Sequence, residues 1–261
     1  MRLYLLIPLC LLLSACSPKK YPLTMDAISA DKAQHIINDI QAQRQDSREE
    51  LIEQVSQSFL GTPYQANTLI GSATEPEKLV VDFNGVDCFT FLDYVNALSQ
   101  SANRTDFFNQ LVKTRYKNGK VAFVNRKHFF TDWFASQPRN AVDVTAHIIS
   151  PKAKVVHKHL NLKAGGGKFI PAIGVFERDI TYIPAGDLDQ AALNAIHSGD
   201  YIGIYSKLDG LDVSHVGIAI RKGDDLYYRN VSSLQRNRRV VDTPFMEYMQ
   251  SKPGIVVLRA L

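Results

Sequence analysis

The chain is poor in cysteine, with three in 261 residues. A small secreted fold held together by many disulfides needs more, so that class is excluded. Cys10 and Cys16 belong to the first 20 residues, which leaves Cys88 as the one cysteine of the remaining chain. In an oxidising compartment an unpaired thiol is a candidate for chemistry. The alternative is a small buried residue, which is the usual setting of a lone cysteine.

A strong excess of one charge is also lacking, because 30 Lys and Arg stand against 26 Asp and Glu, for a net charge of +4. This mild balance suits a protein that works near anionic polymers or acidic substrates, and it does not favour a nucleic-acid partner. The sequence contains no internal repeat and no low-complexity tract. The glycines at 165–167 are not followed by a Gly-Lys-Ser/Thr pattern, so they do not form a phosphate-binding loop.

Long apolar runs are absent except at the N-terminus, where Arg2 precedes an apolar segment at 5–13. This pattern indicates a signal segment. The adjoining Leu13-Ser14-Ala15-Cys16 resembles the lipobox of bacterial lipoproteins, which implies cleavage before Cys16 and acylation of that residue. The alternative is an ordinary signal peptide with an incidental cysteine.

We therefore expect a signal peptide at 1–15, a lipidated linker at 16–28 and a single domain at 29–261. Ser17, rather than an acidic residue, follows the acylated position, which in the bacterial sorting pattern favours the outer membrane. No later stretch is long and apolar enough to span a bilayer, so we expect a soluble, monomeric body tethered in the periplasm by its lipid.

A helix is expected to begin at Cys88. Apolar residues follow at three- and four-residue steps, giving one apolar face down to about Ser99. Asp87 is placed to cap this helix, which puts Cys88 in the first turn. Free backbone N–H groups and the helix dipole favour a thiolate there, so Cys88 is a candidate nucleophile.

A β-hairpin is expected to supply the base that such a nucleophile needs. His215 opens a strand whose same face is otherwise small, and a turn centred between Lys222 and Gly223 places position 215 opposite Asn230. Asn230 can then hydrogen-bond the imidazole and set its tautomer. A slip of one residue puts Arg229 there instead, and arginine cannot accept a hydrogen bond. The alternative for His215 is a core histidine.

The order of elements predicts the fold class. Helical patterns dominate before residue 117, and strand patterns dominate afterwards, which favours an α+β fold with an antiparallel sheet. Asn118-Gly119 predicts a hairpin turn with a returning strand near Phe123. The stretch 142–156, rich in Val, Ile and Thr, predicts a further strand.

Several motifs together resemble the NlpC/P60 cell-wall cysteine hydrolases, and more closely the DUF1460, N-acetylmuramoyl-L-alanine amidase-like branch. They extend from about residue 55 to about residue 235, and comprise Phe59–Tyr64 with Asn67–Ile70, Asp87–Phe91, Arg126 and His128 ahead of Asp132-Trp133, Gly199-Asp200, and Gly210–Ile218.

This resemblance implies a papain-like fold, with the cysteine helix packed on an antiparallel sheet or small barrel. It implies Cys88 as the nucleophile, His215 as the base and a polar third residue. In the family the third residue often lies in a His-Ala-Ser segment, and here Asn230 stands at the position of that histidine. Tyr64 is carried over as a residue beside the oxyanion or substrate pocket, although it is equally a loop tyrosine packed on the cysteine helix.

Four further residues are candidates for substrate binding. Asp87 and Thr90 flank the nucleophile, where the wider superfamily binds substrate, although helix capping alone explains Asp87 equally well. Arg126 and His128 are placed to line the cleft and pair with stem-peptide carboxylates, with a surface salt-bridge cluster as the alternative. His157-Lys158-His159 has no further cysteine or carboxylate at ligand spacing, so we expect no metal site and no cofactor.

The function that follows is that of a periplasmic cysteine hydrolase acting on peptidoglycan or its muropeptides, with the N-acetylmuramoyl–L-alanine amide as the preferred bond. An endopeptidase that cuts between D-Glu and the diamino acid of the stem peptide uses the same residues. A non-catalytic cell-wall binding lipoprotein and a thioester-forming acyltransferase are the alternatives of other classes.

Overall fold

The computed structural model describes residues 21–42, 47–149, 151–235 and 237–261. The predicted signal peptide and its lipidation site, Cys16, lie outside these residues. Within the described part of the chain, no helix has the length and apolar character needed to cross a membrane.

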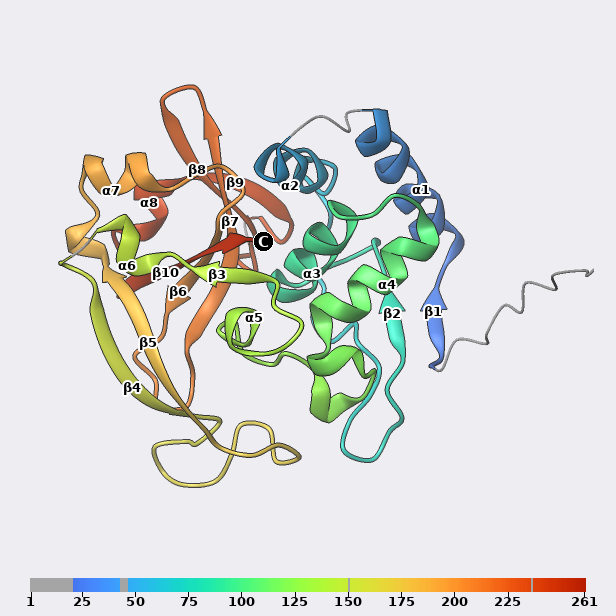
Figure 1. The fold of residues 1–261 in the computed structure, drawn as a ribbon, viewed down its shortest axis with the longest axis horizontal. Helices are drawn as coiled ribbons and strands as arrows, with labels where there is room; N and C mark the ends of the chain where they lie inside the picture. The colour runs from blue at the N-terminus through green and yellow to red at the C-terminus, as the bar shows by residue number, and fades with distance from the viewer. Residues whose placement is uncertain (1–20, 43–46, 150, 236) are drawn as a thin grey trace, which may run out of the picture.

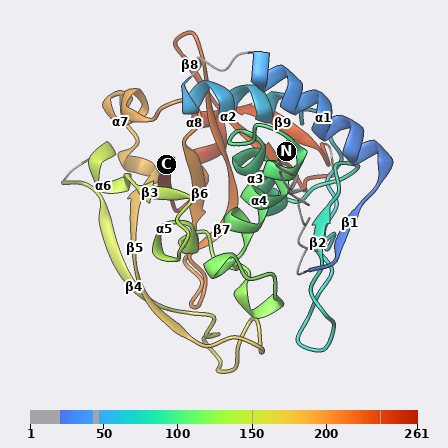
Figure 2. The same cartoon turned by 45° about the vertical axis from the view of Figure 1, so that its right-hand side comes forward.

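The chain folds into a helical half and a sheet half (Figure 1). The main helices are α1 (Ala27–Ala42), α2 (Arg48–Gln57), α3 (Cys88–Leu98) and α4 (Arg104–Arg115). Figure 2, turned by 45°, shows the same four helices gathered beside the sheet. Helix α3 contacts α1, α2 and α4 on one side and the sheet on the other. The predicted helix from Cys88 to about Ser99 is therefore confirmed, and it lies at the junction of the two halves.

The sheet has eight strands among the described residues and is antiparallel at every pairing. Its order is β4 (Lys154–Leu160), β5 (Phe176–Pro184), β10 (Gly254–Ala260), β6 (Tyr201–Tyr205), β7 (Val213–Lys222), β8 (Asp225–Val231) and β9 (Val240–Pro244), with β3 (Ala141–Asp143) paired to β10. The α+β class with an antiparallel sheet is confirmed. Strands β4 and β9 are the two ends of this sheet and do not pair with each other, so the described residues do not form the small closed barrel allowed by the resemblance.

Two short strands tie the N-terminal region to the helical half. β1 (Leu23–Met25) pairs in parallel with β2 (Leu79–Val81). Residues 23–25 belong to the segment expected to be a lipidated linker, and in the structure they hydrogen-bond to a buried strand of the domain.

Two sequence-based expectations about local structure are wrong. Asn118 and Gly119 have positive φ values of 56° and 62°, as a hairpin turn requires. They lie instead in a 3-10 turn, η1 (Lys117–Gly119), and a second such turn, η2 (Phe123–Asn125), replaces the returning strand. The stretch 142–156 is interrupted by a short helix, α6 (Thr145–Ile148). The Asp143 side chain accepts a hydrogen bond from the Thr145 N–H at 2.9 Å, which turns the backbone out of the strand.

The remaining elements are short. They are α5 (Asp132–Ala135), η3 (Ala185–Asp187), α7 (Gln190–Ala195) and α8 (Phe245–Met249).

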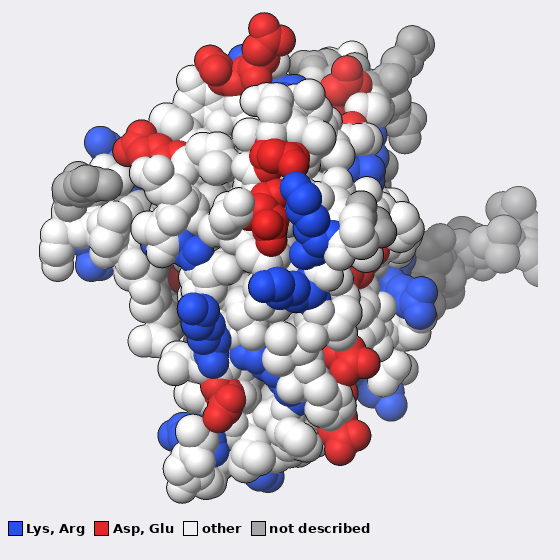
Figure 3. Space-filling model, turned by 90° about the vertical axis from the view of Figure 1, so that its left-hand side faces the viewer, with Lys and Arg blue, Asp and Glu red and all other residues white. Residues whose placement is uncertain are grey.

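On the face drawn in Figure 3, basic and acidic side chains are interspersed. This agrees with the small net charge of the chain.

The core of the helical half is an aromatic cluster that holds α3 in place. Phe83 packs edge-on against Phe59 and Tyr94, with ring centroids 5.0 and 4.9 Å apart, and Phe59 packs against Phe91 at 5.8 Å. Every α3 residue from Thr90 to Leu98 is buried, as expected for a helix enclosed on all sides. This packing fixes the start of α3, and with it Cys88, against the sheet.

Candidate active site

Cys88 occupies the first position of α3, and its helix start is closed by a reciprocal cap. The Asp87 carboxylate accepts hydrogen bonds from the N–H groups of Phe89 at 3.0 Å and Thr90 at 2.7 Å. The Thr90 hydroxyl in turn accepts from the Asp87 N–H at 3.0 Å. The predicted Asp87 cap is confirmed. Because both side chains are engaged in the cap, helix capping accounts for Asp87 and Thr90 without a substrate.

Cys88 and His215 line one cavity of about 150 Å³. Its other lining residues come from the segment before α5, from the loop between β4 and β5 and from the start of β7, and are Phe89, His128, Phe129, Phe130, Phe169, Ile170, Leu211, Asp212, Val213, Ser214 and Val216. The wall is therefore mainly apolar, and the thiol and imidazole groups stand among a few polar ones. This is the usual composition of a site that orients a substrate for chemistry.

Cys88 is half-buried, and its sulfur lies near three backbone donors. Burial, together with the nearby Asp87 carboxylate, raises the pKa of the Cys88 thiol to about 12. Hydrogen bonds from the N–H groups of Val216, Cys88 and Phe89 oppose that rise. The donors at the helix start therefore favour a thiolate, as expected, but desolvation of the sulfur outweighs them in the substrate-free site.

His215 and Asn230 are hydrogen-bonded across neighbouring strands, as predicted. The distance from His215 Nε2 to Asn230 Oδ1 is 3.1 Å. The Asn230 Nδ2 group donates to the Tyr228 carbonyl at 3.2 Å, which directs Oδ1 toward the ring. An oxygen acceptor places the proton on Nε2 and leaves the lone pair on Nδ1. Asn230 is 2% exposed, so water does not compete for this contact.

The register behind this contact differs from the predicted one. Asn230 pairs directly with Gly217, and Lys222 pairs with Asp225, so the turn falls at Gly223-Asp224. The predicted turn centre is one residue too early, which displaces each partner by two positions. Because side chains alternate with a period of two, Asn230 stays on the same face as His215 and contacts it diagonally.

The imidazole is held in its neutral form. Burial lowers the pKa of His215 below its ordinary value, and the Lys252 cation lowers this pKa further, while the hydrogen bond that His215 donates to Asn230 opposes both effects. The resting pair is therefore a neutral thiol and a neutral imidazole. Such a pair reacts by transfer of the thiol proton to the imidazole as the sulfur attacks, which is general-base catalysis.

A second cavity, of about 250 Å³, lies on the other side of His215 and contains residues that the sequence analysis missed. Tyr248 and Lys252 line it together with Ser232 and Asn230. The Tyr248 ring lies 6.3 Å from the His215 ring, and the Lys252 ammonium lies 4.6 Å from the Tyr248 ring centre. No local pattern marks these residues, because they reach His215 only when α8 folds over β8 and β9.

Of the two residues expected to line the cleft, only His128 lines the Cys88 cavity, and Arg126 does not. Arg126 donates to both carboxylate oxygens of Glu77 at 2.8 Å and does not line the Cys88 cavity. The pair is largely buried, so it is a salt bridge but not the surface cluster expected as the alternative, and it accounts for Arg126 without a substrate. His128 does line the cavity, and its Nε2 lies 2.9 Å from the Phe123 carbonyl oxygen. Its role in substrate binding stays a prediction.

Tyr64 lies beside the start of α3 without entering the Cys88 cavity. Its backbone forms a bridge with Val86, and its half-buried ring packs against the main core with the Arg238 guanidinium 5.1 Å from the ring centre. Packing accounts for this position, and an oxyanion role stays a prediction.

Comparisons with known proteins identify a family and a shared fold. A family model described as AmiA-like, N-acetylmuramoyl-L-alanine amidase-like, matches residues 54–255. No curated protein matches the chain. A crystal structure of a DUF1460 protein from Legionella pneumophila has a TM-score of 0.76 and 22% identity, covering 91% of this chain and 97% of that one. This likeness shows a shared fold.

A crystal structure of an N-acetylmuramoyl-L-alanine amidase from Bacteroides uniformis is also similar. It has a TM-score of 0.69 and 27% identity, and the match covers 83% of this chain and 100% of that one. A second crystal structure of such an amidase from the same organism has a TM-score of 0.66 and 26% identity, covering 82% of this chain and 98% of that one.

Proposed function

The chain belongs to the AmiA-like, N-acetylmuramoyl-L-alanine amidase-like family, and on this basis we propose that it is a cysteine hydrolase of peptidoglycan. The preferred bond is the amide between the lactyl group of N-acetylmuramic acid and L-alanine. One observation carries the proposal: Cys88 and His215 line the same cavity, with Asn230 hydrogen-bonded to the imidazole. A nucleophile, a base and a group that orients the base are the minimum set for this chemistry.

The same arrangement supports our placement of the fold with the papain-like NlpC/P60 hydrolases. In this chain a cysteine at a helix start packs on an antiparallel sheet, and the histidine lies on the adjacent strand β7. An asparagine completes the set in place of the more frequent histidine.

The acylation step begins with transfer of the Cys88 proton to Nδ1 of His215. The sulfur forms a bond to the amide carbon, and the carbonyl oxygen gains the negative charge of the tetrahedral intermediate. The Asp87 cap takes the N–H groups of Phe89 and Thr90, so the Cys88 N–H is the donor at the start of α3 that is left for this oxygen. When the carbon–nitrogen bond breaks, the His215 imidazolium returns its proton to the amine. The products are a thioester on Cys88 and the free stem peptide.

The deacylation step uses the same groups, with water as the nucleophile and the Cys88 sulfur as the leaving group. His215 takes a proton from water, and the hydroxide oxygen attacks the thioester carbon. The carbon–sulfur bond breaks, the sulfur recovers its proton from the imidazolium, and the muramyl carboxylic acid leaves. Asn230 keeps Nε2–H in place throughout, so Nδ1 is the nitrogen that exchanges protons.

The site of action follows from the N-terminal motif. We propose that Cys16 is acylated and holds the domain at the outer membrane, facing the periplasm. Membrane fractions of cells that express the chain should contain the lipid-modified protein, whereas a Cys16→Ser variant should be unprocessed or soluble. Unmodified protein free in the periplasm would contradict the anchor and leave the enzymatic proposal untouched.

Mass spectrometry of muropeptides tests the activity. Incubation with the protein should release intact stem peptides and leave muramic acid with a free lactyl carboxylate. A Cys88→Ala variant, which keeps the fold because α3 is capped by Asp87, should release nothing. Cleavage inside the stem peptide would identify an endopeptidase instead, and unchanged muropeptides that remain bound to the protein would identify a binding lipoprotein.

A further inference from the structure

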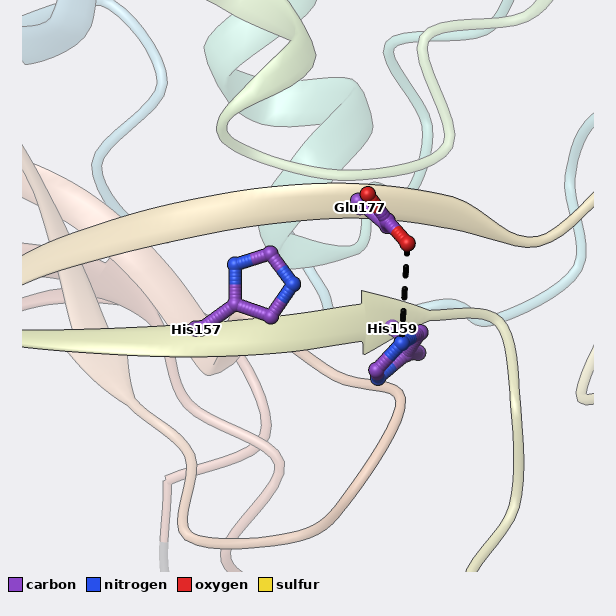
Figure 4. A group of neighbouring side chains, drawn as sticks. All are labelled: His157, His159 and Glu177. Carbon is purple, nitrogen blue, oxygen red and sulfur yellow. Dashed lines mark ion pairs between the residues drawn. The ribbon is translucent and has the colours of Figure 1, made fainter.

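The outward face of the hairpin formed by β4 and β5 carries four side chains suited to a metal ion. In the antiparallel pairing, His157 lies opposite Asp179, and His159 lies opposite Glu177. Residues two apart on a strand share a face, so all four stand on the same side. Figure 4 shows His157 and His159 on β4, with Glu177 reaching from β5 toward His159.

The inward neighbour Lys158 fixes this orientation. Lys158 is 6% exposed, and its ammonium group donates to the carbonyl oxygens of Leu208 at 2.9 Å and Leu211 at 2.8 Å. These bonds hold β4 against the segment that precedes β7. Because Lys158 points inward, the two imidazoles on either side of it must point outward.

The donor atoms are close enough to share one ion. One donor atom from each of His157, His159 and Glu177 lies within 4.8 Å of the other two. Zn²⁺ holds nitrogen and oxygen ligands at about 2.0–2.2 Å. The three side chains are exposed, so they can rotate toward one another around a shared ion. The described residues contain no second group of this kind.

Asp179 adds the contact that usually orients a metal-binding histidine. Its carboxylate oxygen lies 2.8 Å from His157 Nδ1. A carboxylate at this position takes the Nδ1–H and leaves the lone pair of Nε2 directed outward for a metal. The sequence alone predicted no metal here, since no carboxylate lies at ligand spacing from the two histidines. The pairing of β5 with β4 supplies one.

We propose that His157, His159 and Glu177 bind one divalent ion of the Zn²⁺ class, with Asp179 orienting His157. Two imidazoles and one carboxylate favour Zn²⁺ and similar transition metals over Mg²⁺ and Ca²⁺, which prefer oxygen ligands only. Three protein ligands leave a position for water or an outside ligand. The ion joins β4 to β5 below the loop that carries Phe169 and Ile170 into the wall of the Cys88 cavity.

Zn²⁺ titration against a chromophoric chelator tests the site. The full chain is used with all three cysteines replaced by serine, so that no thiol competes for the metal. One Zn²⁺ should bind per chain. His157→Gln, His159→Gln and Glu177→Gln should each weaken binding more than tenfold, and Asp179→Asn should weaken it by roughly 10- to 100-fold.

The matched control is His197→Gln. His197 lies 2.8 Å from the Glu49 carboxylate in another exposed imidazole–carboxylate pair, which belongs to no such group of three. Its removal should leave Zn²⁺ binding unchanged. X-ray absorption at the zinc edge of the cysteine-free chain should show two imidazole ligands, a result that does not depend on any further variant. No bound Zn²⁺, equal losses in His197→Gln and His157→Gln, or fewer than two imidazoles would overturn the proposal.

Discussion

Removal of the Asn230 side chain should slow the reaction without abolishing it. In an Asn230→Ala variant the buried Nε2–H of His215 loses its acceptor at 3.1 Å, and the Tyr228 carbonyl loses a donor at 3.2 Å. The imidazole is then free to take the other tautomer, whose Nδ1 carries a proton and cannot accept one from Cys88. The thiol and the base themselves remain.

The size of the effect follows from the hydrogen bond. Loss of a buried neutral partner costs about 1–3 kcal/mol. If this whole cost falls on the transition state, kcat/KM decreases by roughly 5- to 150-fold. Removal of the nucleophile in Cys88→Ala is a much larger loss, on the order of 10⁴-fold or more, because no thioester can form.

An Asn230→Asp variant separates orientation from charge. The carboxylate keeps the acceptor and adds a negative charge beside the ring, which should raise the pKa of His215. In the parent protein burial lowers the pKa of His215 below its ordinary value. Activity needs the neutral base and is lost as pH falls through this pKa, so the acid limb of the pH profile should move to higher pH in the variant.

The assay is the pH dependence of kcat/KM for release of stem peptide from a soluble muropeptide, with thermal unfolding as the control for folding. An Asn230→Ala variant that matches the parent within twofold at every pH would refute the orienting role. A loss as complete as that of Cys88→Ala, in a folded protein, would show that Asn230 does more than orient. An unmoved acid limb in Asn230→Asp would show that His215 is not the base.

Three further predictions concern charge and packing. Lys252→Met should move the acid limb to higher pH, because the lysine cation lowers the pKa of the imidazole base. Arg126→Ala should lower the free energy of unfolding by about 3–5 kcal/mol with KM unchanged, because it leaves the Glu77 carboxylate buried at 8% exposure without its cation. Gly217→Ala should cost about 1–3 kcal/mol, since its new Cβ would lie 2.6 Å from the Arg229 carbonyl oxygen.

Chemical denaturation and pH–rate profiles check these values against matched controls. Lys152→Ala breaks an exposed ion pair, about half accessible on each side, and should cost less than about 1 kcal/mol. Gly186→Ala adds a Cβ with no atom within 4 Å and should be neutral. A raised KM in Arg126→Ala would restore the substrate-binding role, and an acid limb that moves to lower pH in Lys252→Met would contradict the stated cause.

The features that the sequence predicted correctly depend on interactions between residues close together in the chain. The cap at Asp87 and the start of α3 depend on hydrogen bonds that span three residues, so neither needs the rest of the fold. The contact between His215 and Asn230 was predicted from an incorrect register. The predicted contact is still formed, because a register error of two positions leaves the same side chains on the same face of the strand.

Longer-range contacts explain what the sequence could not predict. The partner of Arg126 is Glu77, 49 residues earlier, and no spacing rule links them. The Asn118-Gly119 signal correctly predicted positive φ values but not the 3-10 turns around them. The metal-binding face depends on the pairing of β4 with β5, which brings Glu177 beside His159 across an intervening loop.

By itself, the sequence identified Cys88, His215 and Asn230 as the candidates for nucleophile, base and orienting group, because each is tied to a local pattern of capping or strand alternation. It also determined the fold class from the order of helical and strand periods. Only the tertiary structure decided how strongly the Cys88 thiol is desolvated, because burial by the surrounding fold is what raises its pKa. It also decided the cavity walls and the place of Lys252, since these join segments that no local rule connects.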